Sequence, residues 1–242
     1  MITTYSSPSE ITLNNRITEH VFNRFGINPN NTDKIYENTV LIEVNPNFLV
    51  DVLNVFCNYK DLNSVIFDKY PIPILIDYLK RSHTYYIEKT LPEIGQSIAI
   101  LLNNYDTEDP LLDILYKFYF KYKVDLETHF INEEELLFPY GNKLYKAFYF
   151  KTEIYFFIDL IQKYSIKDFI NMHTDTAIEL KKIRTILSNY IPPKTNKTSL
   201  RILIEQLKKF EYDLNIHAFI EDKVLVPKIS QLEHKIRLEI NN

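Results

Sequence analysis

Apolar residues recur every three or four positions along most of the chain after about residue 70, which is the spacing of one face of an α-helix. Four such runs cover Ile72–Tyr105, Leu111–Phe150, a segment that opens at Ser165, and Ser199–Ile240. Long helical segments joined by short connections predict an up-down-up-down four-helix bundle. A helical domain of another topology is the alternative that the pattern leaves open.

Prolines and polar clusters punctuate these runs. Pro92 removes one backbone donor and predicts a kink in the first run, and "FPYGN" at 138–142 predicts a bend in the second. "DTEDP" at 106–110 separates the first two runs and offers capping carboxylates. Ser165 is a candidate N-cap of the third run, which stops at the paired prolines of "YIPPKTNKT".

The first 65 residues follow a different pattern. "SEITLNNRITEHVFNRFGI" predicts a helix that ends at Gly26, and "NPNNTD" predicts a turn. "ENTVLIEV" suits either a short strand or a buried linker, and periodicity does not decide between them. "NPNFLVDVLNVFCNYKD" returns to a helical pattern.

We therefore predict an all-α protein of two parts, with a boundary near "FDKYPIP". Residues 1–68 form a small, mostly helical N-terminal domain, and residues 69–242 form the bundle. The chain has only three glycines, which argues against a glycine-rich phosphate loop and against a turn-dense β architecture.

Charge and cysteine usage narrow the function classes. The net charge of −4 gives no electrostatic reason to expect nucleic acid or an anionic membrane surface as a partner. No uncharged apolar run reaches the roughly 18 residues of a spanning helix, and the N-terminus has no secretory signal pattern. The single cysteine, Cys57, fits a reducing compartment. We expect a cytoplasmic protein.

A sequence frame occurs twice, 88 positions apart. "DLETHFINEEELLFP" begins at Asp125, and "DLNIHAFIEDKVLVP" begins at Asp213. Both read D-L-x-x-H-x-x-x-E-x-x-x-L-x-P. The histidine and glutamate of each copy are four residues apart, which places them on one helix face.

Histidines are distributed one to each predicted bundle helix. The four are His83, His129, His173 and His217, at separations of 46, 44 and 44 residues. In an antiparallel bundle such a constant step can return each helix to a similar height, so the four imidazoles can converge in one layer of the core.

Together with Glu133 and Glu221, these histidines predict a metal site in the bundle. Two buried carboxylates need a cation to neutralise them. Two metal ions fit, each with two histidines and both bridged by the glutamates. Nitrogen and oxygen donors without a thiolate suit iron above all, and zinc, manganese and copper stay open.

Other polar residues have less specific interpretations. A lone core histidine is more often a hydrogen-bonded structural residue, so the prediction depends on the six residues occurring together. Asp125 and Asp213, one turn before a histidine, either accept an imidazole N–H or are exposed charges. Three further acids are expected to be solvated, namely Glu134, Glu135 and Asp222. His20 and His234 are expected at the surface.

Four segments resemble the hemerythrin-like (HHE cation-binding) domain, and more narrowly the Repair of Iron Centres proteins, the di-iron iron–sulfur cluster repair family. They are "RSHTYYIEKTLPEI", "HFINEEELLFP", "MHTDTAIELKKIRTILSNYIPP" and "DLNIHAFIEDKVLVPKI", in this order within about residues 70–230. The resemblance implies two non-haem iron ions, oxo- and carboxylate-bridged. The implied ligands are the six that spacing selects: His83, His129, Glu133, His173, His217 and Glu221.

The chain departs from this family in three places. A Cys-Cys pair is common in the family's N-terminal domain, whereas "FNRFGINPNNTD" here has no cysteine. Met172 stands where a glutamate often precedes the third histidine. No histidine occurs in "LLNNYDTED", so a further iron ligand is not expected there.

The resemblance implies a protein of the nitrosative and oxidative stress response that repairs damaged iron–sulfur clusters or reacts with nitric oxide. Whether it turns over as an enzyme stays open. The implied partners are nitric oxide or O₂ at the metal, iron–sulfur client proteins, and a second copy of the chain in a homodimer. One alternative is a sensor or carrier that binds O₂ or nitric oxide without turnover, and another is a metal-free interaction module with structural histidines.

Overall fold

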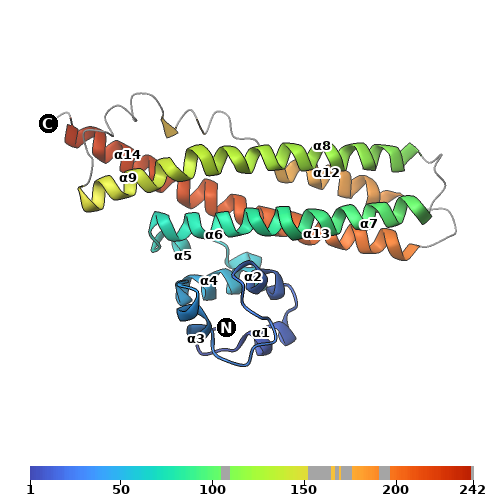
Figure 1. The fold of residues 1–242 in the computed structure, drawn as a ribbon, viewed down its shortest axis with the longest axis horizontal. Coiled ribbons are helices and arrows are strands. Elements are labelled where there is room, and N and C mark those ends of the chain that lie inside the picture. The colour runs from blue at the N-terminus through green and yellow to red at the C-terminus, as the bar shows by residue number, and fades with distance from the viewer. Residues whose placement is uncertain (105–109, 152–164, 167–168, 170–175, 191–196, 241–242) are drawn as a thin grey trace. The chain divides into compact units, whose positions relative to one another are not determined.

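The computed structural model describes residues 1–104, 110–151, 165–166, 169, 176–190 and 197–240. Within these ranges every regular element is a helix and no strand occurs, which confirms the all-α prediction (Figure 1).

The N-terminal residues form short helices where one longer helix was predicted. α1 (Pro8–Asn14) and α2 (Thr18–Arg24) are separated by residues 15–17, the first of which, Asn15, has an extended backbone. α1 begins with a capping box, in which Ser7 accepts from the Glu10 N–H and the Glu10 carboxylate accepts from the Ser7 N–H. The chain turns after α2 at Gly26, which has a φ of 69°, so the predicted end of this helical stretch is confirmed.

The segment "ENTVLIEV" contains helix, and the strand alternative is wrong. α3 spans Ile35–Leu41 and covers its first five residues. The Glu37 carboxylate accepts the backbone N–H of Lys34 at 2.8 Å and so satisfies one of the donors at the start of the helix. This local cap favours helix over the strand preference of the β-branched residues.

The helix predicted in "NPNFLVDVLNVFCNYKD" is confirmed, and two short elements that were not predicted follow it. α4 spans Pro46–Cys57, with Asn45 as its N-cap, and a short 3₁₀ turn, η1, spans Tyr59–Asp61. α5 spans Ser64–Asp68.

Beyond residue 70 the long helices are interrupted by single π-helical turns. α6 (Ile72–Tyr85), the π-turn η2 (Tyr86–Thr90) and α7 (Leu91–Asn104) form the first run. The second consists of α8 (Pro110–Asn132), η3 (Glu133–Leu137) and α9 (Phe138–Phe150). The last consists of α13 (Lys197–Ile220), η4 (Glu221–Leu225) and α14 (Val226–Ile240). Between them, α12 spans Thr176–Asn189 and ends just before the predicted stop.

Each π-turn is followed by a proline at the second position of the next helix: Pro92, Pro139 and Pro227. A proline has no N–H and its ring clashes with the carbonyl four residues earlier. The π-turn makes hydrogen bonds of longer span instead, from the Phe138 N–H to the Glu133 carbonyl and from the Val226 N–H to the Glu221 carbonyl. The helices are thus interrupted close to these prolines. Each interruption is a π-turn rather than the simple kink or bend that the sequence predicts.

Two compact units are distinguished by their internal contacts. One comprises Met1–Tyr85, Gly141–Ile161 and Ile216–Asn242, and the other comprises Tyr86–Tyr140 and Gln162–Asn215. The predicted division at residues 68 and 69 stays a prediction.

In the first unit, Arg24 joins the N-terminal helices to α6. Its buried guanidinium donates to the Tyr78 hydroxyl at 3.0 Å and lies against the rings of Phe56 and Tyr85. His20 is partly exposed, with Nδ1 2.6 Å from the Tyr85 hydroxyl, so its predicted surface position is confirmed only in part. His234 is exposed, as predicted.

Also in the first unit, α9 and α14 run side by side and parallel. A Cβ placed on Gly141 would lie 2.6 Å from Cδ1 of Ile229, and Lys151 forms an ion pair with Glu239 at 3.0 Å. The partners in both contacts are 88 residues apart, which is the offset of the repeated sequence frame. The helices that follow the two copies of the frame therefore pack side by side at the offset of the repeat.

In the second unit, α7, α8, α12 and α13 contribute to one apolar core. Its buried side chains include Leu91, Ile94, Leu115, Tyr122, Leu180, Ile183, Leu207 and Phe210. Burial of each large apolar side chain stabilises the fold by about 1.5–3 kcal/mol. Arg184 of α12 also forms an ion pair with Glu211 of α13.

No helix in the described part of the chain combines the length and apolar character that crossing a bilayer requires.

Candidate metal centre

His83 and His217 come together from distant parts of the sequence. His83 lies near the end of α6 and His217 lies near the end of α13, with 1% and 3% of their surfaces exposed. Their ring centroids are 5.0 Å apart and the ring planes make an angle of 42°. α6 and α13 therefore present these two histidines to each other.

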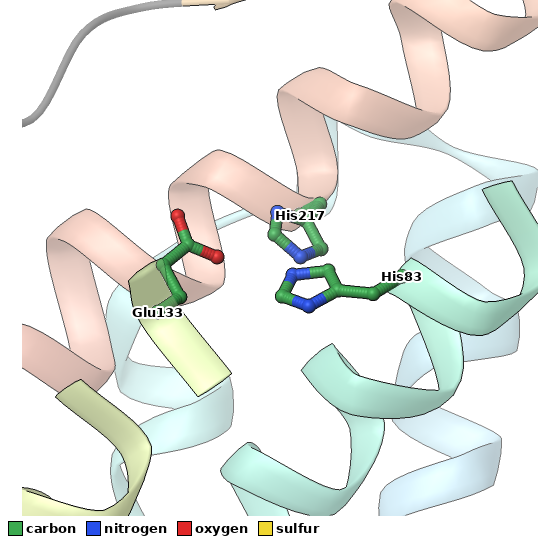
Figure 2. Close-up of side chains that lie close together, drawn as sticks. All are labelled: His83, Glu133 and His217. Atoms are coloured by element: carbon green, nitrogen blue, oxygen red, sulfur yellow. The ribbon is translucent and has the colours of Figure 1, made fainter. Parts of the chain in front are cut away.

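Glu133 completes a group with these two imidazoles. It is the first residue of η3 and is fully buried. One carboxylate oxygen of Glu133 and one ring nitrogen from each of His83 and His217 all lie within 4.8 Å of one another. Figure 2 shows the carboxylate directed toward the two rings.

Each repeated His-x-x-x-Glu frame keeps its pair on one helix face. Nε2 of His129 lies 2.6 Å from Oε1 of Glu133, and Nδ1 of His217 lies 3.9 Å from Oε2 of Glu221. Glu221 is buried like Glu133. His173, the remaining predicted ligand, lies outside the described residues, as does Met172 beside it. The set of six ligands therefore stays a prediction, of which three members form the group above.

The acids beside the predicted ligands have the expected exposure. Glu135 is exposed, and Glu134 and Asp222 are partly exposed. Burial thus singles out Glu133 from its two glutamate neighbours in the same π-turn.

The structure gives Asp125 and Asp213 different roles. Asp125 is half exposed and forms an ion pair with Lys121 at 2.8 Å, so it is a surface charge. Asp213 is buried, and its Oδ1 accepts a hydrogen bond of 2.5 Å from the hydroxyl of Tyr86.

Tyr86 is a residue near the centre that the spacing of the histidines does not reveal, although the sequence holds another signal for it. Tyr86 is six residues before Pro92, just as Glu133 and Glu221 are six residues before Pro139 and Pro227. If the three helical runs are aligned by their prolines instead of by their histidines, Tyr86 takes the position that Glu133 and Glu221 hold in the other two runs.

The chemistry of the donor set fits a transition-metal ion. The ionised carboxylate of Glu133 is costly to bury, and a cation between it and the two imidazoles would offset that cost. Two ligand atoms about 2.1 Å from one ion lie at most about 4.2 Å apart, so the three atoms would have to move closer together to bind the same ion. Imidazole and carboxylate together suit iron, manganese, zinc or copper.

The fold and this group define an all-helical protein with a buried histidine–glutamate group that could hold a metal ion. Over nearly its whole length the chain is a distant homologue of the iron-sulfur cluster repair protein ScdA of Staphylococcus haemolyticus (strain JCSC1435). The two are 24% identical over 233 residues, which are 95% of this chain and 100% of the relative. This similarity confirms the predicted resemblance. No family model matches the chain.

Proposed function

We propose that the chain is a non-haem di-iron protein of the nitrosative and oxidative stress response, which acts in the repair of damaged iron–sulfur clusters. The observation that carries the proposal is the buried group of His83, Glu133 and His217. It occurs in a chain that is similar from end to end to a relative named as an iron–sulfur cluster repair protein.

The proposed architecture is a hemerythrin-like bundle with up-down-up-down topology. Several contacts support it: α7 packs against α8, and α8 packs against α12. η2 and α13 run antiparallel, because Tyr86 contacts Asp213 whereas the earlier His83 contacts the later His217. The parallel packing of α9 and α14 suits the second and fourth helices of such a bundle.

The proposed ligands of the two irons are the six predicted from spacing: His83, His129, Glu133, His173, His217 and Glu221. The two glutamates are proposed as bridges, since each begins a π-turn and is buried. When bound, iron would supply Lewis acidity and redox change to a small ligand such as nitric oxide or O₂. The side chains would orient the ions and exclude bulk water, with iron–sulfur proteins as the proposed clients.

Metal analysis tests the site. We expect about two irons per chain in the purified wild-type protein, as in other two-metal carboxylate bundles. Glu133→Gln should lower the iron content strongly, because the amide is neutral and binds iron poorly. Glu134→Gln and Glu135→Gln remove the same charge one and two residues away and should keep the wild-type content. Iron-free wild-type protein, or equal loss in all three variants, would contradict the proposal.

A repair assay tests the function. An enzyme whose iron–sulfur cluster has been damaged by nitric oxide is incubated with the wild-type protein or with His129→Ala. We expect recovery of enzyme activity with the wild type and little with the variant. Equal recovery with both would rule out a repair role for this centre. Measuring nitrous oxide after adding nitric oxide to the reduced protein then separates turnover from simple binding.

A further inference from the structure

Tyr86 and Asp213 form a buried polar pair next to the metal candidates. Tyr86 is fully buried and Asp213 is 6% exposed. The phenol donates to the carboxylate, and this O–H···O contact connects η2 with α13 across 127 residues of sequence. A hydrogen bond to a charged acceptor in such surroundings is among the stronger ones in proteins.

The position of this pair relative to the histidines is specific. Tyr86 comes three residues after His83, and Asp213 comes four residues before His217. In both cases the spacing is about one helical turn. The pair therefore lies one turn away from the two facing imidazoles, on the same two antiparallel helical segments.

Tyr86 also occupies an equivalent position to Glu133 and Glu221 in the recurring π-turns. In the part of the chain that the structure describes, three residues begin a π-turn, and two of them, Glu133 and Glu221, are the buried carboxylates. Tyr86 begins the third. Where the other two π-turns supply a carboxylate, this one supplies a phenol that reaches across to α13.

We infer that Tyr86 is a positioning residue of the metal centre. Its hydrogen bond to Asp213 holds η2 and α13 in the register that brings His83 and His217 face to face. The inference rests on the proposed function, because it takes the two histidines as iron ligands.

A purely apolar contact at this place would not set the register as well. The Tyr86 ring already packs against Phe130 and Phe210, with centroid distances of 5.9 and 5.2 Å. Such ring contacts tolerate sliding along the helix. A hydrogen bond requires one donor and one acceptor at a fixed separation, so the hydroxyl adds the directional element.

The test compares metal binding by variants of the full chain. Tyr86→Phe removes only the hydroxyl and keeps the ring contacts. Iron(II) is titrated without oxygen, and cobalt(II) serves as a probe whose visible absorption reports ligand geometry. We expect the affinity for both ions to fall about 10–100-fold, as is usual when a partner that orients a ligand is removed, and the cobalt bands to shift.

Tyr119→Phe is the matched control. The Tyr119 hydroxyl donates to the Leu91 carbonyl at 2.9 Å, so this variant also loses one phenol hydrogen bond between helices. Tyr119 is ten residues before His129, which is about 15 Å along the helix. Its metal affinity and cobalt spectrum should match the wild type. Asp213→Asn, which can still accept the phenol proton, should retain more affinity than Asp213→Leu.

Each outcome has a definite meaning. If the wild-type protein binds neither iron nor cobalt, the proposed function fails and the inference fails with it. If the wild type binds metal and Tyr86→Phe binds it with equal affinity and an unchanged spectrum, the site stands and the role of Tyr86 is wrong. Equal weakening in Tyr119→Phe would show a general effect on stability and would also overturn the role of Tyr86.

Discussion

At the scale of single residues, burial rather than residue type distinguishes the candidates. "NEEELL" contains three consecutive glutamates, of which only Glu133 is both fully buried and within 2.6 Å of His129. The four-residue spacing from His129 was enough to select it from sequence. The different surroundings of Asp125 and Asp213 could not be foreseen, because they occupy the same place in the repeat and differ only in what packs against them.

The burial of Glu133 gives a prediction for the metal-free protein. Glu133→Gln removes a buried negative charge and keeps a side chain that can still bond to His129, so without metal it should raise the free energy of unfolding by about 1–3 kcal/mol. Urea denaturation in the presence of a chelator measures this, with Glu135→Gln as the exposed control. A clear loss of stability in the metal-free variant would show that the carboxylate serves the fold rather than the metal.

A second residue-scale prediction concerns Cys57, the last residue of α4. Partial burial of its sulfur raises the pKa of the thiol, so less thiolate is present at neutral pH. The alkylation rate of Cys57 at pH 7.5 should therefore be below that of free cysteine. Its rise with pH should have a midpoint above about 8.5, the ordinary thiol value.

The denatured protein is the control for this thiol and should react like free cysteine. If the alkylation rate of the native protein instead has its pH midpoint at or below the ordinary thiol value, Cys57 is an activated thiol.

At the scale of elements, helix existence was predictable and the π-turns were not. Hydrophobic periodicity found each long run, because spacings of three and four persist across an interruption. A π-turn changes the phase of the pattern by only a fraction of a turn, so the runs looked continuous. The prolines gave the approximate places of the interruptions but not their kind.

The element scale also shows where local signals compete. In "ENTVLIEV" the β-branched residues favour a strand, and the Glu37 cap favours a helix. The cap is a specific hydrogen bond, and the helix forms. The contact of Tyr86 with Asp213 has no local signal at all, since it depends on how two distant helices pack.

Gly95 offers a test of packing between α7 and α8. A Cβ at this position would lie 2.5 Å from the Tyr119 hydroxyl and 2.9 Å from its ring carbon Cζ. Alanine normally favours a helix over glycine by about 1 kcal/mol. Here the displaced ring should also lose its bond to the Leu91 carbonyl, and we expect Gly95→Ala to be destabilising overall, by about 1–2 kcal/mol.

Chemical denaturation of Gly95→Ala alone and combined with Tyr119→Ala checks this explanation. Once the ring is absent, the same alanine should become stabilising relative to glycine. An equal effect of Gly95→Ala in both backgrounds would contradict the proposed clash.

At the scale of the whole molecule, the repeated sequence frame was the most informative feature. Its offset of 88 residues returns in the contacts of Gly141 with Ile229 and of Lys151 with Glu239. Sequence alone could therefore predict the helical class and reveal the repeated frame. It could not predict which side chains come together at the candidate metal centre, because that depends on packing between segments far apart in the chain.

The last prediction links metal binding to the stability of the whole chain. The ligand candidates belong to α6, η3 and α13, so a bound ion would connect segments that are separate in sequence. A ligand at 100 times its Kd stabilises the native state by about 2.7 kcal/mol. For a chain of this length that corresponds to a rise in Tm of roughly 5–10 °C. Thermal unfolding with added iron, compared with unfolding in chelator, should show this rise for the wild type. The rise should be lost in Glu133→Gln and kept in His234→Ala, which changes an exposed histidine. An equal rise in all three proteins would mean that iron binds elsewhere.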